Sequence, residues 1–374
     1  MQALVEELNS RREAGGAIEV DIFTSQPNRY ASLSTEAPAN EDHGWLRIHR
    51  IPIASHKGGM KDQALAYLHY ARGVHKLSAA GRWDIVVATS SRLMTAALGA
   101  HVARKIRAPL YLDIRDLFTD NMREMLAKSP LRILTPVFRW IEKRTFRQAS
   151  RINLVSQGFL PHIRTVAPSV PVSVLTNGID RTFLTDTFEK KGAKAELPLI
   201  LYAGNMGEGQ GLHLIVPEAA KRLEGVAQFR LIGDGGKRTA LVDALSADAV
   251  KNVELCSPIP RRELSEQYRQ ADFLLMHLND LDAFRRVLPS KVFEYGATGK
   301  PILAGVAGYA AEFCRMNLPD AFVFNPLDAN GLVQSVKQAI SDPVHIDREL
   351  FRETYARERI TRQLVEDILA TTYI

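Results

Sequence analysis

Two glycine-rich turns are the first segments of this 374-residue chain that could do chemistry. Residues 202–211 read YAGNMGEGQG and residues 231–236 read LIGDGG; each follows a run of strand-forming residues and precedes a helical pattern. Glycines let the backbone approach a ligand closely, and helix N-termini attract anions. Neither spacing is GxGxxG, and no GxxxxGK[ST] occurs, which disfavours dinucleotide and Walker sites. We expect both turns to face one crevice and bind an anionic ligand; the alternative is a pair of ordinary strand–helix turns.

A third segment, residues 288–303, reads LPSKVFEYGATGKPIL. Ser290 is a plausible N-cap of a helix that begins beside Lys291. Free N–H groups of the first turn, together with the Lys291 ammonium, would suit a diphosphate. Glu294 lies one turn further on and could accept two hydrogen bonds from a ribose diol. The alternative is that Glu294 only stabilises the first turn of its helix.

A fourth segment, residues 112–118, reads LDIRDLF and ends a strand pattern. Three charged residues directly after a buried strand are unusual unless they are paired or functional. Arg115 and Asp116 are therefore candidate catalytic residues. The alternative is an Asp–Arg ion pair that holds the loop.

A basic, aromatic helix is predicted within residues 131–151. Leu134, Val137, Phe138 and Ile141 share one face. Basic residues mixed with aromatic ones suit an anionic membrane interface, although such a helix more often packs on a sheet. The residues we expect to contact a membrane are Arg139, Trp140, Lys143 and Arg147, with Arg144 and Phe146 nearby.

Elements that position these segments alternate between strand and helix patterns, which predicts parallel sheets covered on both faces. Strands are expected at residues 20–24, 85–88, 110–113, 152–155 and 172–175, with helices at 62–77, 94–105 and 131–148. The pattern restarts with strands at 199–203, 229–232, 253–255, 273–276, 301–304 and 321–324, and helices at 212–223, 261–270 and 290–298.

The fold class is therefore α/β, with two Rossmann-like doubly wound domains facing a cleft. We expect the first domain at residues 1–178, the second at 179–354, and a C-terminal helix of about 355–374 that packs back on the first. Charged residues 186–197 read as a linker. The chain opens on a helix, so the usual first strand and its turn are missing, through the choice of start site or a trimmed domain.

Composition fits a soluble globular protein, with 46% apolar and 24% charged residues. The net charge of +6 favours anionic partners such as nucleotides or phospholipid surfaces; we expect no nucleic-acid partner. Cys256 and Cys314 lack metal-ligand spacing and are predicted to be reduced, buried thiols. No apolar run reaches membrane-spanning length and no signal peptide is evident, so we expect a cytoplasmic protein, peripheral at most.

Taken in order, these segments resemble GT-B glycosyltransferases, most closely retaining family 4 in its branch for O-antigen and capsule synthesis. The resemblance runs from Val20 onward through LDIRDLF, LTNGID (residues 175–180), YAGNMGEGQGL, LIGDGG and PSKVFEYGATGKPIL, of which the last is the most specific. It implies donor transfer without a metal or other cofactor, with retention of configuration. A UDP-sugar is the preferred donor, a GDP-sugar the second, and a polyprenyl-diphosphate-linked saccharide the expected acceptor at the bacterial inner membrane.

The resemblance also implies roles for individual residues. Glu294 matches the second glutamate of the family's E-x7-E motif, which holds the donor ribose and is counted with the catalytic candidates. Asp116 falls in the loop that approaches the reacting sugar from the acceptor side. Asn177, Gly178 and Asp180 match the segment that enters the hinge. The implied donor-binding residues are Gly204, Asn205, Gly207, Gln210, Gly233, Gly235, Arg285, Arg286, Ser290, Lys291 and Glu294.

The chain departs from the family pattern at several of these positions. Arg286 stands where the first glutamate of E-x7-E is expected, and Arg115 where many members carry His. Asn205 and Gln210 replace an Arg and a Lys of the phosphate loop. We hypothesise that Arg285, Arg286 and Lys291 supply the lost positive charge, because a diphosphate leaving group needs cations.

Two other functions remain open at this point. Nucleotide-sugar 2-epimerases share the two-domain fold, although no acid–base set for elimination and re-addition can be assembled here. A non-catalytic nucleotide-sugar-binding subunit would fit the missing first strand and Arg286.

Overall fold

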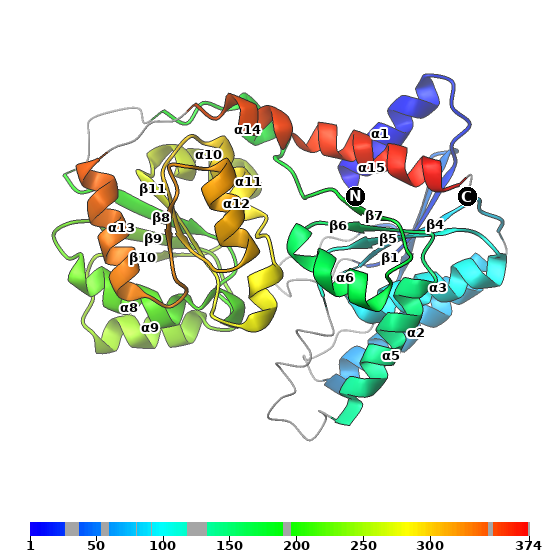
Figure 1. Cartoon of the computed structure of the whole chain (residues 1–374), viewed down its shortest axis with the longest axis horizontal. Helices are drawn as coiled ribbons and strands as arrows, with labels where there is room; N and C mark the ends of the chain where they lie inside the picture. Colours follow the sequence, from blue (N-terminus) through cyan, green and yellow to red (C-terminus); the bar gives the residue numbers. More distant parts are fainter. Residues whose placement is uncertain are drawn as a thin grey trace.

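The computed structural model describes residues 1–26, 37–53, 60–79, 81–90, 92–117, 133–189, 196–342 and 347–372. Figure 1 shows two α/β domains side by side, joined along one edge by crossing segments. Among the residues that the structure describes, every strand pairing is parallel except that of β2 with β3, which is antiparallel. The predicted fold class is confirmed.

The first domain contains two sheets. Their strand orders are β1-β3-β2 and β4-β5-β6-β7. Buried apolar runs form the central strands, as parallel sheets require, since helices cover both faces. The strands are β1 (Val20–Ser25), β2 (Asn40–Asp42), β3 (Leu46–Ile51), β4 (Val86–Ser90), β5 (Leu110–Ile114), β6 (Arg151–Leu154) and β7 (Val172–Val174). The helices are α1 (Gln2–Glu13), α2 (Met60–Ser78), α3 (Leu93–Ile106), α5 (Thr135–Arg147) and α6 (Leu160–Val166), with a 3-10 turn, η2 (Gln157–Phe159).

The two sheets of the first domain are separated between β1 and β4. Within the described residues no backbone ladder joins β1 to β4, although Phe23 of β1 and Val86 of β4 contribute to one apolar cluster. In a doubly wound sheet the first strand lies at the centre, between the second and the fourth. In this chain the break between β1 and β4 lies at that central position.

The second domain is a single six-stranded parallel sheet in the order β10-β9-β8-β11-β12-β13. Alternation along β8 builds a core on each face: Leu201 and Ala203 join one cluster, and Ile200 and Tyr202 the other. The strands are β8 (Leu199–Ala203), β9 (Gln228–Ile232), β10 (Val253–Cys256), β11 (Phe273–His277), β12 (Ile302–Gly305) and β13 (Phe322–Phe324). The other elements are α7 (Arg181–Thr185), η3 (Glu208–Gln210), α8 (Leu212–Arg222), α9 (Arg238–Ala247), α10 (Arg261–Gln270), η4 (Asp282–Arg286), α11 (Lys291–Ala297), α12 (Tyr309–Asn317), α13 (Ala329–Ser341), α14 (Glu349–Thr354) and α15 (Arg357–Thr371).

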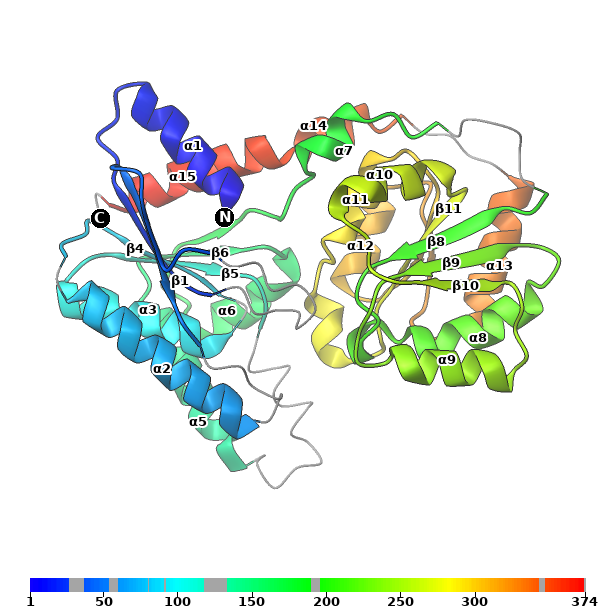
Figure 2. The ribbon, with the colours of Figure 1, turned by 180° about the vertical axis from the view of Figure 1, so that it is seen from behind.

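The chain crosses between the domains twice, and the two crossings pair with each other. The Ile179 N–H donates to the Tyr355 carbonyl (2.7 Å), and the Arg357 N–H donates to the Ile179 carbonyl (2.9 Å). After the second crossing α15 packs on α1 and on the first domain, where Leu364 and Ile368 contact Tyr111. Figure 2 shows α15 returning over the first domain from α14.

Several sequence expectations change in detail. Residues 186–197 were predicted as a linker, yet Phe188 within them is buried against Phe183 in the second domain's core, and residues 190–195 lie outside the described chain. Both cysteines are free, but only Cys314 is buried; Cys256 is half-buried. Strands β2 and β3 were missed, because β2 is polar and acidic, and basic residues interrupt the apolar pattern of β3.

Candidate functional site

The two glycine-rich turns pack backbone against backbone at the carboxyl ends of β8 and β9. Gly233 has a φ of +147°, and a Cβ atom there would lie 1.8 Å from the Gly204 carbonyl oxygen. The Met206 N–H donates to the Asp234 carbonyl at 2.8 Å. No side chain fits between the turns, so glycine is required by contact and by backbone conformation. The two turns form one cradle, which we call the double turn (residues 204–211 and 233–236).

Lys291 reaches the double turn from α11. A Cβ atom on Gly204 would lie 2.1 Å from the Lys291 Nζ, and that Nζ is 5.5 Å from the centre of the Tyr202 ring. Burial lowers the pKa of Lys291, and Glu294 opposes this with a smaller effect. Within the described part of the chain Lys291 has no ion-pair partner. A desolvated, unpaired ammonium beside a glycine cradle is suited to an anion that arrives from solution.

Glu294 lies one helical turn beyond Lys291 and is held from two sides. Arg261 donates to Glu294 Oε1 at 2.8 Å, and the Tyr268 hydroxyl donates to Oε2 at 3.2 Å. Arg261 also forms an ion pair with Asp180. The Glu294 side chain is only 17% exposed, so its carboxylate is fixed in position while unoccupied lone pairs remain available.

Ser290 stands at the predicted N-cap position, but its side chain does not cap the helix. Ser290 precedes α11, but its backbone is helical (φ −59°, ψ −25°) and its side chain makes no cap hydrogen bond. The capping role proposed for Ser290 was therefore wrong.

Asn205 and Gln210 are paired with each other. The Asn205 side-chain amide donates to Gln210 Oε1 at 2.7 Å, and the Gly207 N–H donates to the same oxygen at 3.2 Å. From β11, His277 Nδ1 lies 2.6 Å from the Gln210 carbonyl, and the Asn279 amide donates to the Glu208 carbonyl. These contacts fix the shape of the turn, so Asn205 and Gln210 contribute structure rather than charge.

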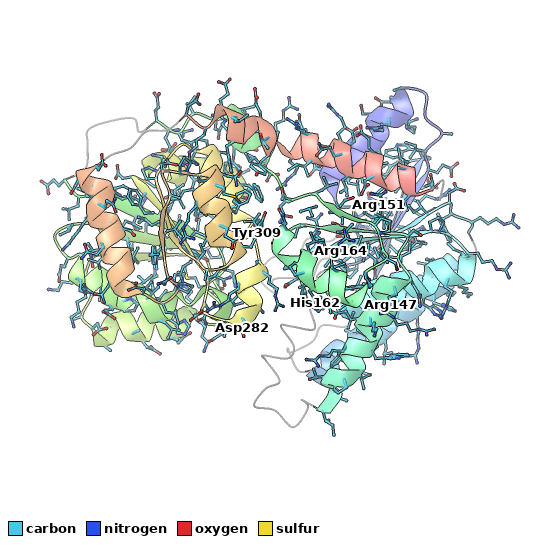
Figure 3. The ribbon with its side chains drawn as sticks, viewed as in Figure 1. Arg147, Arg151, His162, Arg164, Asp282 and Tyr309 are labelled. Carbon is cyan, nitrogen blue, oxygen red and sulfur yellow. The ribbon has the colours of Figure 1, made fainter. Side chains whose placement is uncertain are left out.

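The other two proposed cations lie in η4, at the edge of the second domain. Arg285 is paired with Asp280 (3.3 Å) and Asp282 (3.7 Å). The Arg286 carbonyl accepts a hydrogen bond from the Ser156 hydroxyl of the first domain at 2.5 Å. Figure 3 shows Asp282 on the side of the second domain that faces the first. The geometry thus brings Lys291 to the double turn, whereas Arg285 is engaged with carboxylates.

On the first-domain side, Arg115 donates through Nε to Asp113 (2.8 Å) and through Nη1 to the Asn177 side chain (2.6 Å). The predicted alternative, an Asp–Arg ion pair holding the loop, is therefore present. Asp113 is buried and also accepts from Thr89 and Asn153. Asp116 is half-buried in the loop that follows β5.

A continuous polar chain links Arg115 to Glu294 across the hinge. From Asn177 it passes to Arg357, whose guanidinium donates to the carbonyls of Asn177 (3.1 Å) and Gly178 (3.2 Å). Arg357 then pairs with Asp180, and Asp180 with Arg261. Arg115 and Glu294 are thus connected through residues 177–180 and Arg357, although Arg115 contacts Asn177 directly and Glu294 reaches Asp180 only through Arg261.

Sequence reasoning missed Arg261, Tyr268, Lys237 and Arg357. Lys237 directly follows the second glycine-rich turn and pairs with Glu208 at 2.9 Å, so its proximity to LIGDGG was an available signal. Arg261 and Tyr268 lie 33 and 26 positions before Glu294, and no local spacing predicts that they meet it.

The basic helix α5 is less buried than an ordinary sheet-covering helix. Leu134, Val137 and Trp140 are 39%, 51% and 61% exposed, whereas Glu142, Thr145 and Phe146 are buried. Across the described segments, no helix combines the length and apolarity that a bilayer span requires.

Comparison with known families agrees with this geometry. Residues 1–178 match the model of a glycosyl transferase 4-like domain, and residues 197–342 match glycosyl transferases group 1. The chain belongs to the GT-B glycosyltransferases of family 4. Its double turn, Lys291 and Glu294 lie in the group 1 part, and Arg115 and Asp116 in the 4-like part.

Individual relatives are distant. WcaI of Escherichia coli K12, named for colanic acid biosynthesis glycosyl transfer, is 26% identical over 174 residues, which span 46% of this chain and 42% of WcaI. Anabaena HepE, solved with UDP and glucose, has a TM-score of 0.64 at 14% identity over 86% of each chain. WaaG, a glycosyltransferase involved in lipopolysaccharide biosynthesis, has a TM-score of 0.60 at 17% identity, over 98% of this chain and 91% of WaaG.

Proposed function

We propose that this glycosyltransferase moves a sugar from a nucleotide-sugar donor to a lipid-linked or saccharide acceptor in cell-surface polysaccharide synthesis. The observation that carries the proposal is the meeting of Lys291, the double turn and the fixed Glu294 carboxylate at one edge of the second sheet. A UDP-sugar is the preferred donor, because HepE was solved with UDP, and a GDP-sugar is the second choice.

In this proposal Glu294 accepts hydrogen bonds from the ribose diol, and Lys291 contacts the diphosphate. Negative charge develops on the diphosphate as the bond between the sugar's anomeric carbon and the phosphate oxygen breaks. The Lys291 ammonium stabilises this charge more strongly than a solvent-exposed ammonium would, because burial has removed much of its water. The same desolvation raises the free energy of the ammonium in the empty site. A bound diphosphate lowers that free energy again by pairing with the charge.

On the acceptor side, the hydroxyl oxygen of the acceptor forms the new bond to the anomeric carbon. We propose that attack occurs on the face from which the diphosphate leaves, which retains configuration, and that the diphosphate takes the hydroxyl proton. Asp116 and Arg115 would orient the acceptor in the loop after β5. The chemistry requires no metal in this scheme, since Lys291 supplies the positive charge.

The exposed surface of α5 supports a proposal for the acceptor class and its location. Its exposed Val137 and Trp140 lie among exposed Arg139, Lys143 and Arg147. We propose that this helix contacts the anionic cytoplasmic face of the inner membrane, where a polyprenyl-diphosphate-linked saccharide is available. The names of WcaI and WaaG support a role in O-antigen, capsule or related polysaccharides. Salt-independent absence of vesicle binding would contradict the membrane contact.

The first experiment is thermal unfolding of the wild type and a Glu294→Ala variant with UDP, GDP, ADP and UDP-sugars. A ligand at 100 times its Kd adds roughly 2.7 kcal/mol, or about 5–10 °C. We expect UDP to shift the wild type and not the variant. A wild type that no nucleotide shifts would refute the donor site and favour a chain without transferase activity.

A second assay separates a transferase from a nucleotide-sugar 2-epimerase. UDP release from the donor that gives the largest shift is followed with and without membrane-extracted lipid-linked saccharides. A transferase releases UDP in proportion to added acceptor, while an epimerase converts the donor with no acceptor and releases no net UDP.

A further inference from the structure

A groove separates α3 from α5 on the helical side of the first domain, away from the double turn. It holds a half-open hollow of about 120 Å³, lined on α3 by Ala97, Ala100, His101 and Arg104, on α5 by Trp140, Ile141, Arg144 and Thr145, and by Gln148, which directly follows α5. The small side chains of Ala97 and Ala100, one turn apart on α3, leave room for this hollow, and the Trp140 ring forms one of its walls. The Arg144 guanidinium is held 5.6 Å from the centre of that ring, so one cation is positioned at the groove.

Positive charge around this groove is not neutralised by its own helices. The one carboxylate on α3 and α5 is Glu142, which is buried and bonded to His162 of α6 at 3.0 Å. At the end of α3, the Lys105 ammonium lies 3.2 Å from His75 Nε2, and the His75 and His101 rings are 5.5 Å apart. Burial first, and then His75, Arg104 and Lys105, lower the pKa of His101. The exposed cations of the two helices are Arg104, Lys105, Arg139, Lys143, Arg144 and Arg147.

Exposed apolar side chains continue from the groove toward the N-terminal end of α5. Ile133 and Val137 are 77% and 51% exposed, and on α2 Leu65 and Leu68 are 65% and 48% exposed. Figures 1 and 2 show the N-terminal ends of α2 and α5 projecting in the same direction from the first domain, and both helices pack on α3. Figure 3 places Arg147 at the opposite end of α5. A polar, cationic end and an apolar end on one surface match an amphiphile with an anionic head.

We propose that the groove between α3 and α5 binds the phosphate of an anionic phospholipid headgroup, with Arg104 and Arg144 as its ligands. Two guanidiniums suit a phosphate, because each presents several N–H donors in a planar fork. The indole of Trp140 lies at the headgroup level, and the apolar side chains of α5 and α2 face the acyl region. This inference rests on the proposed membrane contact of α5 and adds a discrete lipid site to it; it does not depend on transferase activity.

The test is co-sedimentation of the full chain with phosphatidylcholine vesicles, with and without phosphatidylglycerol. We expect binding only with phosphatidylglycerol. The double variant Arg104→Gln/Arg144→Gln is expected to bind about thirtyfold more weakly. Each cation near an anionic surface strengthens binding about fivefold, and the variant removes two of them. The matched control, Arg262→Gln/Arg315→Gln, removes the same charge from exposed positions of the second domain and should bind like the wild type.

A groove-filling variant, Ala97→Phe, separates a lipid site from general charge attraction because it keeps every cation. We expect at least a tenfold loss of vesicle binding, with the UDP-induced shift in Tm unchanged. Wild-type affinity in Ala97→Phe, or equal losses in the groove and control pairs, would overturn the site while leaving membrane contact in place. Inorganic phosphate that displaces the protein at low millimolar concentration would instead assign the groove to free phosphate. A wild type that binds neither vesicle would refute both the groove and the membrane contact.

Discussion

Replacing Lys291 by methionine should change stability and nucleotide binding in opposite directions. In the free protein the Lys291 ammonium is desolvated, has a lowered pKa and has no ion-pair partner within the described residues. Methionine has a similar length and no charge to desolvate. The Tm of the unliganded variant should therefore equal or exceed that of the wild type, whereas most buried substitutions lower it.

The loss of binding follows from the contact that is removed. A hydrogen bond to a charged group contributes about 1.5–3 kcal/mol, so a loss of about 2 kcal/mol raises the Kd of UDP about thirtyfold. At a concentration of 100 times the wild-type Kd, the stabilisation falls from about 2.7 to about 0.9 kcal/mol. The shift in Tm falls from about 5–10 °C to about 2–4 °C.

Differential scanning fluorimetry with a UDP titration measures both quantities on one sample. Lys337→Met, on the exposed face of α13, removes the same charge far from the double turn and should leave the UDP shift unchanged. A Lys291→Met variant with a lower Tm and a full UDP shift would refute the reasoning, because the ammonium would then be structural.

Three further predictions concern the surroundings of this site. Gly233→Ala should abolish the UDP shift, because the added Cβ would clash with the Gly204 carbonyl. It should also destabilise the fold by several kcal/mol, roughly the cost of a forced backbone change. In the same Tm assay Gly236→Ala should be neutral, because a Cβ atom there meets nothing within 4 Å. Arg261→Gln should raise the donor KM about threefold to tenfold at similar kcat, by freeing the Glu294 carboxylate; its effect should be less than additive with Glu294→Gln, and full additivity would exclude the contact. Burial lowers the pKa of His277 from 6.5 to about 4. Because the unfolded state then binds more protons, the free energy of unfolding should fall by about 2 kcal/mol as the pH is lowered from 7.5 to 5. Urea titrations of His277→Gln should lose this part of the pH dependence, and an unchanged dependence of the unfolding free energy on pH would show that His277 protonates freely in the folded state.

The sequence predicted the second domain more closely than the first. Strand β8 and helix α10 were predicted with their observed bounds, because a fully buried parallel strand is a continuous apolar run and α10 is bounded by proline and alanine. In the first domain β2 and β3 were missed, since Arg47, His49 and Arg50 interrupt the apolar pattern and are paired with Asp21, Asn40 and Glu41 instead. Such polar pairs across strands are tertiary and leave no local period.

The candidate site divides in the same way. Lys291, Glu294 and the glycines are local motifs, so their roles could be proposed from spacing. The engagement of Arg285 with Asp280 and Asp282, and of Asn205 with Gln210, depends on how the turns fold. Arg261 and Arg357 come from segments far along the chain, so no window of sequence could associate them with Glu294.

Because the chain crosses between the domains twice, the core of each domain contains residues from both halves of the chain. Residues up to 189 carry Ile179, Phe183 and Phe188 into the second domain's core, while residues from 196 onward carry Leu364 and Ile368 back to the first domain. A gene divided between these positions would therefore encode two fragments that each lack part of a core they must complete. Neither fragment corresponds to a domain, and co-expression should reassemble a single particle in which each half is the folding partner of the other.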